Sequence, residues 1–387
     1  MSRVREVPIT SEVLRWAIDE SGWERPDLAE KLKVSSDTLQ SWETGSDHPS
    51  QTQFNALVQY LKRPSAVFFL PSPPPSDDLP SAFRSVAGEN ISSGPEERRH
   101  LREARRVQAE LSAIIQDLNY PEVELFPAST NDDPQEIARA ERARFGISIE
   151  TQLGWRSESE AFDEWRSALG NIGVLVFLQQ IGHGNMRGYA LRDEYAPITG
   201  INTTGFNVTS RIYSMFHEYA HLLLGADDVT HQLASPKKWD SQLDIERWCE
   251  RFAASFLLPR EDLESHLRSE YGWHSGHTLG VDEVRSKLNR LANRFKVSLR
   301  AMALRLQDIG IAPKTLFESL GPTPPRGGGG GKGMPRAERA RRKYGLQAMV
   351  LIREALQRDV IGVHDVLDLL GITFDDWAQL DSEMGKG

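Results

Sequence analysis

Cysteine is nearly absent from this chain, which has 387 residues and a single cysteine, Cys249. One thiol cannot form an internal disulfide, and such a composition suits the reducing cytosol, so we expect a cytoplasmic protein. A thiolate-rich zinc knuckle is excluded as well, because that site needs several cysteines. Any metal that this chain binds must therefore be held by histidine and carboxylate side chains.

Long apolar runs and an excess of positive charge are also missing. The sequence has no stretch of about 18 consecutive apolar residues, so we expect no contact with the membrane interior. Its first residues, M-S-R-V-R-E-V-P-I-T, lack the apolar core of a signal peptide. The formal net charge of −9 argues against a protein that coats nucleic acid without regard to sequence, although it leaves room for a local DNA-reading module.

What the sequence does contain is an H-E-x-x-H motif within Arg211–Gly225. His217 and His221 are four residues apart, so on a helix both project from one face and both imidazoles can reach one zinc ion. Glu218 follows the first histidine and can act as a general base toward a water molecule at the metal. The motif therefore predicts a metallopeptidase-like site, provided that the segment is helical.

The residues around the motif predict that helix. Apolar residues recur at helical spacing, Thr209 or Ser210 can cap the start, and Gly225 can end it. The alternative to a metal site is a buried helix that happens to carry two histidines. An apolar helix seldom buries two histidines and a glutamate without partners, because desolvating them is costly. We therefore favour the metal site.

A catalytic zinc takes three protein ligands, so a third must come from elsewhere. The metzincin layout would need glycine at 224 and histidine at 227, where the chain has Leu224 and Asp227. Asp227 or His231 could approach from the following loop. We favour Glu246, which lies with Glu250 at the edge of an apolar stripe in D-I-E-R-W-C-E-R-F-A-A-S-F-L-L-P, where Glu250 could receive the free N–H of a ligand histidine. The alternative is a pair of exposed surface glutamates.

Four short helical patterns occupy about residues 8–64. The second and third are joined by the tight turn Lys33–Val34–Ser35, a helix-turn-helix arrangement whose third helix could read the major groove. Residues 1–64 hold eight lysines and arginines against ten aspartates and glutamates, a balance of −2 that is unusual for a domain that neutralises phosphates. The alternative is a docking or dimerisation domain, which would make a homodimer. The outward candidates for DNA contact are Ser36, Asp37, Thr38, Gln40 and Ser41.

Composition divides the chain into four parts. We predict a helix-turn-helix domain with a proline-rich linker at 1–75, a helical connecting region at 76–165, a peptidase core at 166–325, and a glycine-rich tether with a C-terminal helical segment at 326–387. The arginine-rich helix Glu96–Leu118 is more typical of a solvated face paired with neighbouring glutamates than of a DNA contact. The basic patch that includes Arg336, Arg339, Arg341, Arg342 and Lys343 is interpreted in the same way, as a solvated run.

The N-terminal part resembles the XRE (Cro/repressor-type) helix-turn-helix family. The resemblance rests on D-L-A-E-K-L-K-V-S-S-D-T-L-Q-S-W-E-T-G, followed by Pro49 and Phe54-x-x-Leu57. A small sheet is predicted at residues 172–178, 188–191 and 197–202, ahead of the H-E-x-x-H helix.

The later part resembles the ImmA/IrrE family of metallopeptidases. The matching motifs are Gly188-x-x-Leu191, Ile201-Asn202, H-E-Y-A-H-L-L-L-G and E-R-W-C-E-R-F-A-A-S-F-L-L-P. Glu246 falls on the metal-binding glutamate of that family, Cys249 on its alanine and Glu250 on its asparagine.

Together the segments look like the two-domain XRE–ImmA/IrrE subgroup. This resemblance implies an α+β, mostly helical protein, with an all-α helix-turn-helix domain and a zincin-like, gluzincin-like peptidase built on a small sheet and the H-E-x-x-H helix. It also implies a zinc-dependent endopeptidase that cleaves a partner repressor and so derepresses stress-response, prophage or mobile-element genes. Two histidines and a glutamate accept Mn²⁺ as well as Zn²⁺. Candidate donors to the oxyanion of the reaction are Tyr213, Tyr219 and His231.

A second interpretation places the function in another class. The chain would be a DNA-binding transcriptional regulator or antitoxin-like protein that binds specific DNA through residues 25–45, with a structural or sensory metal site. We rank catalysis first, because the motif includes a general base that stability alone does not need.

Overall fold

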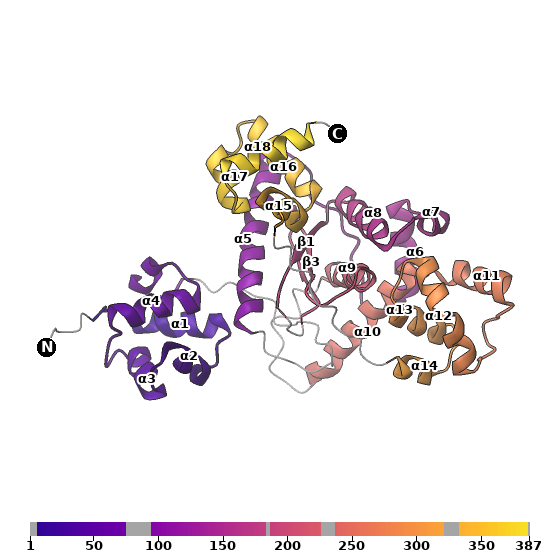
Figure 1. Ribbon diagram of the computed structural model, residues 1–387, viewed down its shortest axis with the longest axis horizontal. Helices are drawn as coiled ribbons and strands as arrows, with labels where there is room; N and C mark the ends of the chain where they lie inside the picture. The colour runs from indigo at the N-terminus through magenta and orange to yellow at the C-terminus, as the bar shows by residue number, and fades with distance from the viewer. Residues whose placement is uncertain (1–5, 75–93, 183–185, 226–236, 321–332, 386–387) are drawn as a thin grey trace. The chain divides into compact units, whose positions relative to one another are not determined.

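The computed structural model describes residues 6–74, 94–182, 186–225, 237–320 and 333–385. Contacts along the chain divide it into two units, residues 1–80 with 89–104 and residues 81–88 with 105–387. The described part is mostly helical with one three-stranded sheet, which confirms the predicted α+β class (Figure 1). In these ranges, no helix combines the length and the apolar character needed to cross a lipid bilayer.

The first unit is a bundle of short helices around a small apolar core. Trp42, Phe54 and Phe68 are buried at its centre, and the ring of Phe68 meets that of Phe54 edge to face. The stretch after the fourth helix is therefore part of this core. The elements are α1 (Ser11–Ser21), α2 (Arg25–Leu32), α3 (Ser36–Thr44), α4 (Gln51–Leu61) and the 3-10 helix η1 (Ser65–Phe69).

The arginine-rich segment forms one long helix, α5 (Pro95–Asp117), whose first turns belong to the first unit and whose remainder belongs to the second. Arg106 pairs with Glu110 one turn on, as predicted. Arg98 and Arg102 instead donate to the main-chain carbonyls of Asp19 and Glu20, at the end of α1. Carbonyls at a helix C-terminus lack helical partners and attract cations, which explains this difference from the predicted pairing with glutamates.

The second unit contains the sheet and the remaining helices, and its three strands lie within a few residues of the predicted segments. Its elements before the sheet are α6 (Pro134–Phe145), α7 (Ile149–Gly154) and α8 (Glu158–Asn171), and the strands are β1 (Leu175–Gln179), β2 (Gly188–Leu191) and β3 (Ile198–Asn202). The helices that follow are α9 (Val208–Leu223), α10 (Lys237–Leu257), α11 (Arg260–Tyr271), α12 (Val281–Phe295), α13 (Leu299–Asp308) and α14 (Lys314–Ser319).

The sheet has the order β1-β3-β2, with β1 parallel and β2 antiparallel to β3. Every residue of β1 and β3 is buried, including the polar Gln179, Thr199 and Asn202, which indicates that both faces of these strands are covered. Gly200 on β3 faces Tyr189 on β2, and a Cβ atom at Gly200 would lie 1.9 Å from Cζ of that ring. Only glycine leaves room for the tyrosine there. The outer edge at β2 contacts α9, the helix that carries the H-E-x-x-H motif.

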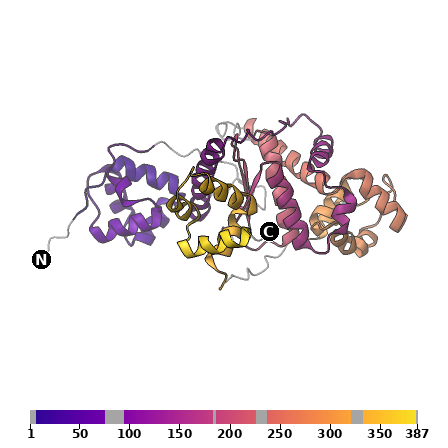
Figure 2. The ribbon, with the colours of Figure 1, turned by 90° about the horizontal axis from the view of Figure 1, so that it is seen from above.

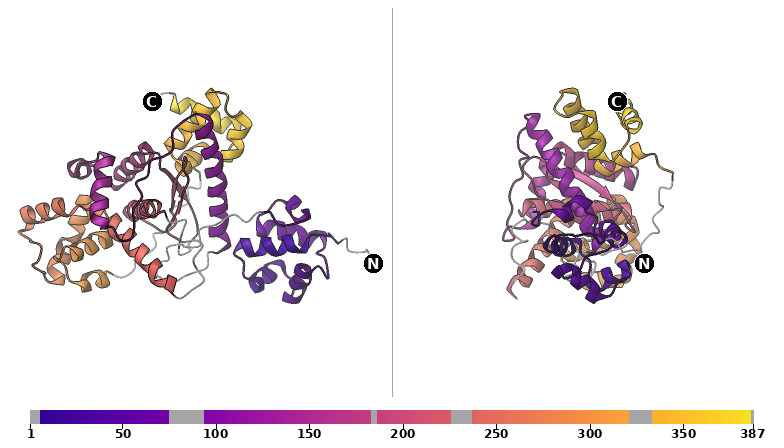
Figure 3. Two further views of the ribbon diagram at one scale, coloured as in Figure 1. Left: turned by 180° about the vertical axis from the view of Figure 1, so that it is seen from behind. Right: turned by 90° about the vertical axis from the view of Figure 1, so that its left-hand side faces the viewer.

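The C-terminal helices α15 (Arg336–Tyr344), α16 (Leu346–Gln357), α17 (Val363–Leu370) and α18 (Phe374–Met384) form one cluster beside the sheet (Figures 1, 2 and 3). Helix α15 packs against the edge strand β1. It buries Ala337, Ala340 and Tyr344, which recur at the spacing of one helix face. The basic patch predicted to be solvated is therefore the outer side of a helix that covers a sheet edge, a usual way to protect unpaired strand groups.

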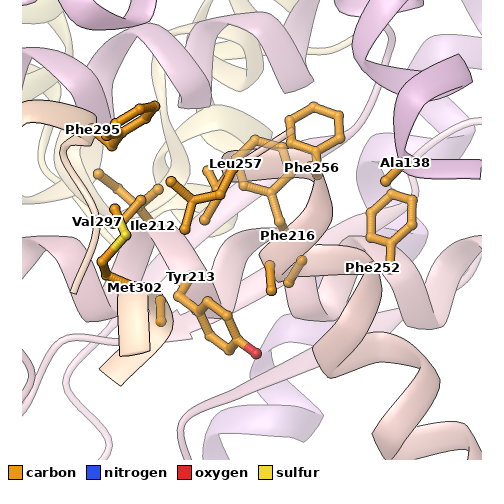
Figure 4. Packing of buried hydrophobic residues seen from close by; sticks show 14 of the residues in the cluster. Ala138, Ile212, Tyr213, Phe216, Phe252, Phe256, Leu257, Phe295, Val297 and Met302 are labelled. Carbon is orange, nitrogen blue, oxygen red and sulfur yellow. The ribbon is translucent and has the colours of Figure 1, made fainter. Parts of the chain in front are cut away.

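Aromatic side chains form the centre of the second unit, where α9 packs on α10 (Figure 4). Phe216 on α9 stacks on Phe256 on α10 with ring centroids 4.2 Å apart. Trp165 from α8 meets both rings, with centroid distances of 5.0 and 5.5 Å. These contacts fix how closely the two helices approach one another.

Three buried polar side chains satisfy the C-terminal end of α10. Arg142 donates to the carbonyl of Phe256, the amide of Gln152 donates to that of Leu257, and Arg305 donates to that of Leu258. The side-chain oxygen of Gln152 also accepts a bond from Arg142 at 2.8 Å. A helix end in the protein interior needs such partners, since its last carbonyls have none within the helix.

Within the described residues one local geometry occurs three times, in what we call the tight-turn pairs: α2 with α3, α12 with α13, and α17 with α18. In each, the first helix ends in a left-handed residue, and the next amide donates to a carbonyl five residues back. A Ser or Thr N-cap then accepts from the amide three residues on. The left-handed residues are Lys33, Lys296 and Gly371, and the caps are Ser35, Ser298 and Thr373.

The amide of Gln152 also donates to the carbonyl of Phe295 at 2.8 Å. We predict that Gln152→Leu lowers the free energy of unfolding by about 2–3 kcal/mol, because it leaves the carbonyls of Leu257 and Phe295 without their donor. Urea denaturation of the full chain measures this change. Gln379→Leu, on the exposed side of α18, serves as the control and should stay within about 0.5 kcal/mol of the unsubstituted protein. Equal stability of the two variants would contradict the role of Gln152.

Candidate metal centre

The H-E-x-x-H segment lies on α9, a helix that is buried on almost every side. Its N-cap is Asn207, whose side-chain oxygen accepts from the amide of Ser210 at 2.8 Å. The helix therefore begins before Thr209 and Ser210, the two predicted caps, because an asparagine two or three positions earlier supplies the same bond. Gly225 follows the helix with a φ of +64°, which agrees with the predicted stop.

Three side chains from two helices converge at this point: His217 and His221 from α9 and Glu246 from α10. The two Nε2 atoms are 3.2 Å apart, and the Glu246 carboxylate oxygens lie 3.2 Å from Nε2 of His217 and 3.4 Å from that of His221. Ligand atoms held 2.0–2.1 Å from a tetrahedral zinc are about 3.3 Å from one another. The donor set and its spacing therefore fit a divalent ion.

The three side chains of this cluster differ in how exposed they are to solvent. His217 is fully buried, whereas the side chains of His221 and Glu246 keep 13% and 27% of their exposure. The cluster is thus anchored in the protein interior on one side and reaches solvent on the other. That combination suits a site at which a substrate can approach the open side of an ion.

The part of α10 that follows Glu246 holds this residue in place. Downstream, its apolar stripe is buried against α9 and α6. The Tyr213 hydroxyl on α9 donates to the main-chain carbonyl of Glu250 at 3.0 Å, which ties the two helices together one turn from the ligands. The carboxylate of Glu250 is not one of the three groups that converge. Its predicted bond to a ligand histidine stays a prediction.

Glu218 lies on the face of α9 that meets β2. Only 3% of it is exposed, and its carboxylate lies against Gly188 at the start of that strand. A Cβ atom at position 188 would be 2.7 Å from Oε1 of Glu218 and 2.8 Å from the carbonyl oxygen of Gly200. The glycine is therefore needed for the strand to pass this close to the carboxylate. The sequence contained this residue only as part of a family motif, without a signal for its role.

The other predicted residues of the catalytic region have different positions. The Tyr219 hydroxyl is bonded to the Glu141 carboxylate, which also pairs with Arg144. Burial and the neighbouring carboxylate raise the pKa of Tyr219 well above its ordinary value. This hydroxyl is committed to a structural cluster, so we do not carry Tyr219 into the proposed mechanism. His231 and Asp227 lie outside the described residues.

The predicted DNA-contacting residues lie on α3 and around its start. Ser36 and Gln40 are exposed, and Thr38 and Ser41 are half-buried. Thr38 shares a bond of 2.8 Å with the cap Ser35, and the Ser41 hydroxyl donates to the Thr38 carbonyl. The nearby cation Arg25 pairs with Asp19 and Glu43, which further reduces the positive charge offered to a phosphate backbone. DNA binding by this surface stays a prediction.

Comparison with known families adds one decisive observation. Residues 170–307 match the model of the IrrE N-terminal-like domain, Peptidase_M78. This range includes β1, β2, β3, α9 and α10, with the three converging ligands and Glu218. The chain thus contains a metallopeptidase-like domain, of a family that is typically metal-dependent.

Comparison with whole proteins adds little. No curated protein matches the chain. Among solved structures, a Mycobacterium tuberculosis transcriptional regulator is similar over 52% of this chain and 51% of that chain, with 13% identity and a TM-score of 0.31. The chain therefore spans about half the length of that protein, and a TM-score this low establishes no common fold.

We predict that Glu246→Ala weakens Zn²⁺ binding on the order of 100-fold or more, because it removes one of three direct ligands. Isothermal titration of the metal-free full chain with Zn²⁺ measures this change. Asp244→Asn, on the exposed side of the same helix, is the matched control and should bind as the unsubstituted protein does. Unchanged affinity in Glu246→Ala would show that another residue is the third ligand.

Proposed function

We propose that this protein is a metal-dependent endopeptidase that cleaves a partner repressor or regulator protein. The observation that carries the proposal is the spacing of His217, His221 and Glu246, which suits a tetrahedral ion, next to a buried carboxylate at Glu218. The match of residues 170–307 to the Peptidase_M78 model supports it. Zn²⁺ is the expected ion, and Mn²⁺ is compatible with the same donors.

The roles of the residues follow from their positions. His217, His221 and Glu246 would hold the ion, which supplies Lewis-acid polarisation of a peptide carbonyl and lowers the pKa of a water molecule. Glu218 accepts the proton of the attacking water and returns it to the leaving amine, as a general base and then a general acid. Its burial beside β2 keeps bulk water from competing for that proton. Tyr213, the other described candidate for a donor to the oxyanion, already donates its hydroxyl hydrogen to the Glu250 carbonyl, so this role would require that bond to break.

The partner and the setting are also part of this proposal. The family resemblance supports a DNA-binding repressor as the substrate, whose loss would derepress stress-response, prophage or mobile-element genes. The first unit would bring the peptidase to that repressor, by binding the same DNA or by docking to the protein. The single buried cysteine suits action in the cytoplasm.

We predict that Glu218→Gln reduces cleavage by a factor on the order of 10²–10⁴, because glutamine cannot accept the proton, while metal binding is retained. The test is co-expression with the product of the adjacent gene, followed by detection of that product. Wild type should deplete the product, and Glu218→Gln should leave it intact at equal metal content. Glu136→Gln, an exposed glutamate on α6, controls for the loss of a carboxylate and should cleave normally. Undiminished cleavage by Glu218→Gln would refute the proposed chemistry.

A second candidate function is regulation through sequence-specific DNA binding by residues 25–45. The exposed polar residues of α3 favour it, and the acidic balance of the unit opposes it. We predict that DNA upstream of the protein's own gene is retained in a gel shift at moderate salt, that Glu218→Gln retains it, and that Gln40→Ala releases it. Gln51→Ala, at the exposed start of α4, is a control of the same residue type. Failure to retain any specific DNA would leave protein docking as the function of the first unit.

A further inference from the structure

A cavity of about 650 Å³ lies in the second unit, away from the metal centre. Its walls come from α8, from β1, from the first turns of α9, and from the junction of α15 with α16. The cavity therefore exists only because the C-terminal helices pack beside the sheet. Its volume is in the range of pockets that bind small molecules.

Four arginines line this cavity: Arg166 from α8, Arg211 from α9, and Arg341 and Arg342 from α15. Arg166 donates to the main-chain carbonyls of Arg342, Lys343 and Val176, and Arg211 donates to that of Thr203. Among the residues that the structure describes, no carboxylate lies within ion-pair distance of the guanidinium groups of Arg166, Arg211 and Arg342. Arg166 and Arg211 are half-buried and Arg342 is exposed, so an anion in the cavity could pair with all three guanidinium groups.

The guanidinium group of Arg166 lies close to the main chain at Gly345. Gly345 has a φ of +88°, and a Cβ atom there would lie 3.0 Å from Nη2 of Arg166 and 3.2 Å from its Cζ. Glycine at the α15–α16 junction thus makes room for the guanidinium. The position of Arg166 is set by three carbonyls and this turn, which makes it a fixed part of the cavity wall.

The pKa values of these arginines reflect their burial and their closeness to one another. Burial lowers the pKa of Arg166 to about 10, with Asp163 acting against this shift and Arg342 adding to it. Burial also lowers the pKa of Arg211, and Arg342 adds to that shift as well. Arg342 therefore disfavours the charge of both Arg166 and Arg211, whereas Asp163 favours that of Arg166. Arg341 differs, since Glu338 and Glu383 lie 3.8 and 3.9 Å from it.

The rest of the cavity is partly apolar. Phe162, Val174, Leu178 and Val208 line the side formed by α8, β1 and α9, and Leu346 lines the opposite side. Inorganic phosphate alone would fill only a small part of 650 Å³. A ligand that joins an anion to an apolar or aromatic body would use both kinds of wall.

We propose that this cavity binds an organic phosphate monoester, with the phosphate between Arg166, Arg211 and Arg342 and an aromatic or apolar body against Phe162 and Leu346. The charged residues that line the cavity are four arginines (Arg166, Arg211, Arg341 and Arg342) and three carboxylates (Asp163, Glu164 and Glu338), so their net charge of +1 would attract the −1.5 to −2 of a phosphate monoester at neutral pH. Guanidinium groups pair with phosphate oxygens through parallel hydrogen bonds, which favours arginine at such a site.

A ligand in this cavity would contact α9, the helix that also carries Glu218. Arg211 and Glu218 are seven residues apart on α9, two turns along the same face. A bound phosphate would join the start of this helix to α15 and so fasten the C-terminal helices to the peptidase domain. The binding itself does not depend on the proposed peptidase activity.

The test is isothermal titration of the full chain with adenosine monophosphate and phenyl phosphate, and separately with adenosine and inorganic phosphate. We expect at least one of the two monoesters to bind more tightly than either adenosine or inorganic phosphate. Arg342→Gln should weaken that binding on the order of 10-fold or more, through loss of a charge-assisted bond. Arg339→Gln, on the same helix but outside the cavity, is the matched control and should bind normally.

The following results would overturn the proposal. One such result is that neither monoester binds at millimolar concentration. Another is that adenosine or inorganic phosphate binds as tightly as the monoesters do. Equal affinity in Arg342→Gln and Arg339→Gln would also refute it, because the exposed Arg342 side chain can be replaced without loss of packing. Thermal unfolding of both variants, followed by circular dichroism, shows that each is folded, and metal content reports separately on the other site.

Discussion

The contact between α9 and α10 is the interaction on which the rest of the site depends. Phe216, next to the first ligand histidine, stacks on Phe256, and the Tyr213 hydroxyl reaches the backbone of α10. Because the rings pack at van der Waals distance, the separation of the two helices has little freedom. Glu246 therefore meets the two histidines at distances that an ion requires, and the metal centre is a consequence of helix packing.

That packing in turn relies on polar groups far from the ligands. The end of α10 is buried, and Arg142, Gln152 and Arg305 come from three different helices to bind its last carbonyls. On the other side, β2 reaches Glu218 only because Gly188 has no side chain. The Glu218 carboxylate is thus enclosed between β2 and its own helix, each held by its own set of contacts.

The sequence was sufficient for features that depend on local spacing. The two histidines and Glu218 could be predicted because a helix repeats every 3.6 residues, and Glu246 because its stripe repeats in the same way. The exact start of α9 could not, since several residues in a row were able to cap it. The proximity of Gly188 to Glu218 and the meeting of three arginines depend on tertiary packing. Such contacts join distant segments and produce no periodic pattern in the sequence. Helix α15 escaped prediction because alanines, which carry a weak apolar signal, make most of its contact.

The tight-turn pairs have a consequence for how such sequences are interpreted. The position of Gln40, exposed on α3, corresponds to Ala303 on α13, which is fully buried, and to Ala378 on α18, which is exposed beside Asp375 and Phe374. The same turn thus presents a neutral polar surface once, a core surface once and an acidic, partly aromatic surface once. The hydrogen bonds and the cap of the turn are shared by all three pairs, whereas the chemistry of the second helix differs among them. In this chain the same helix–helix turn recurs, and the residues around each copy determine whether its second helix faces solvent or the protein core.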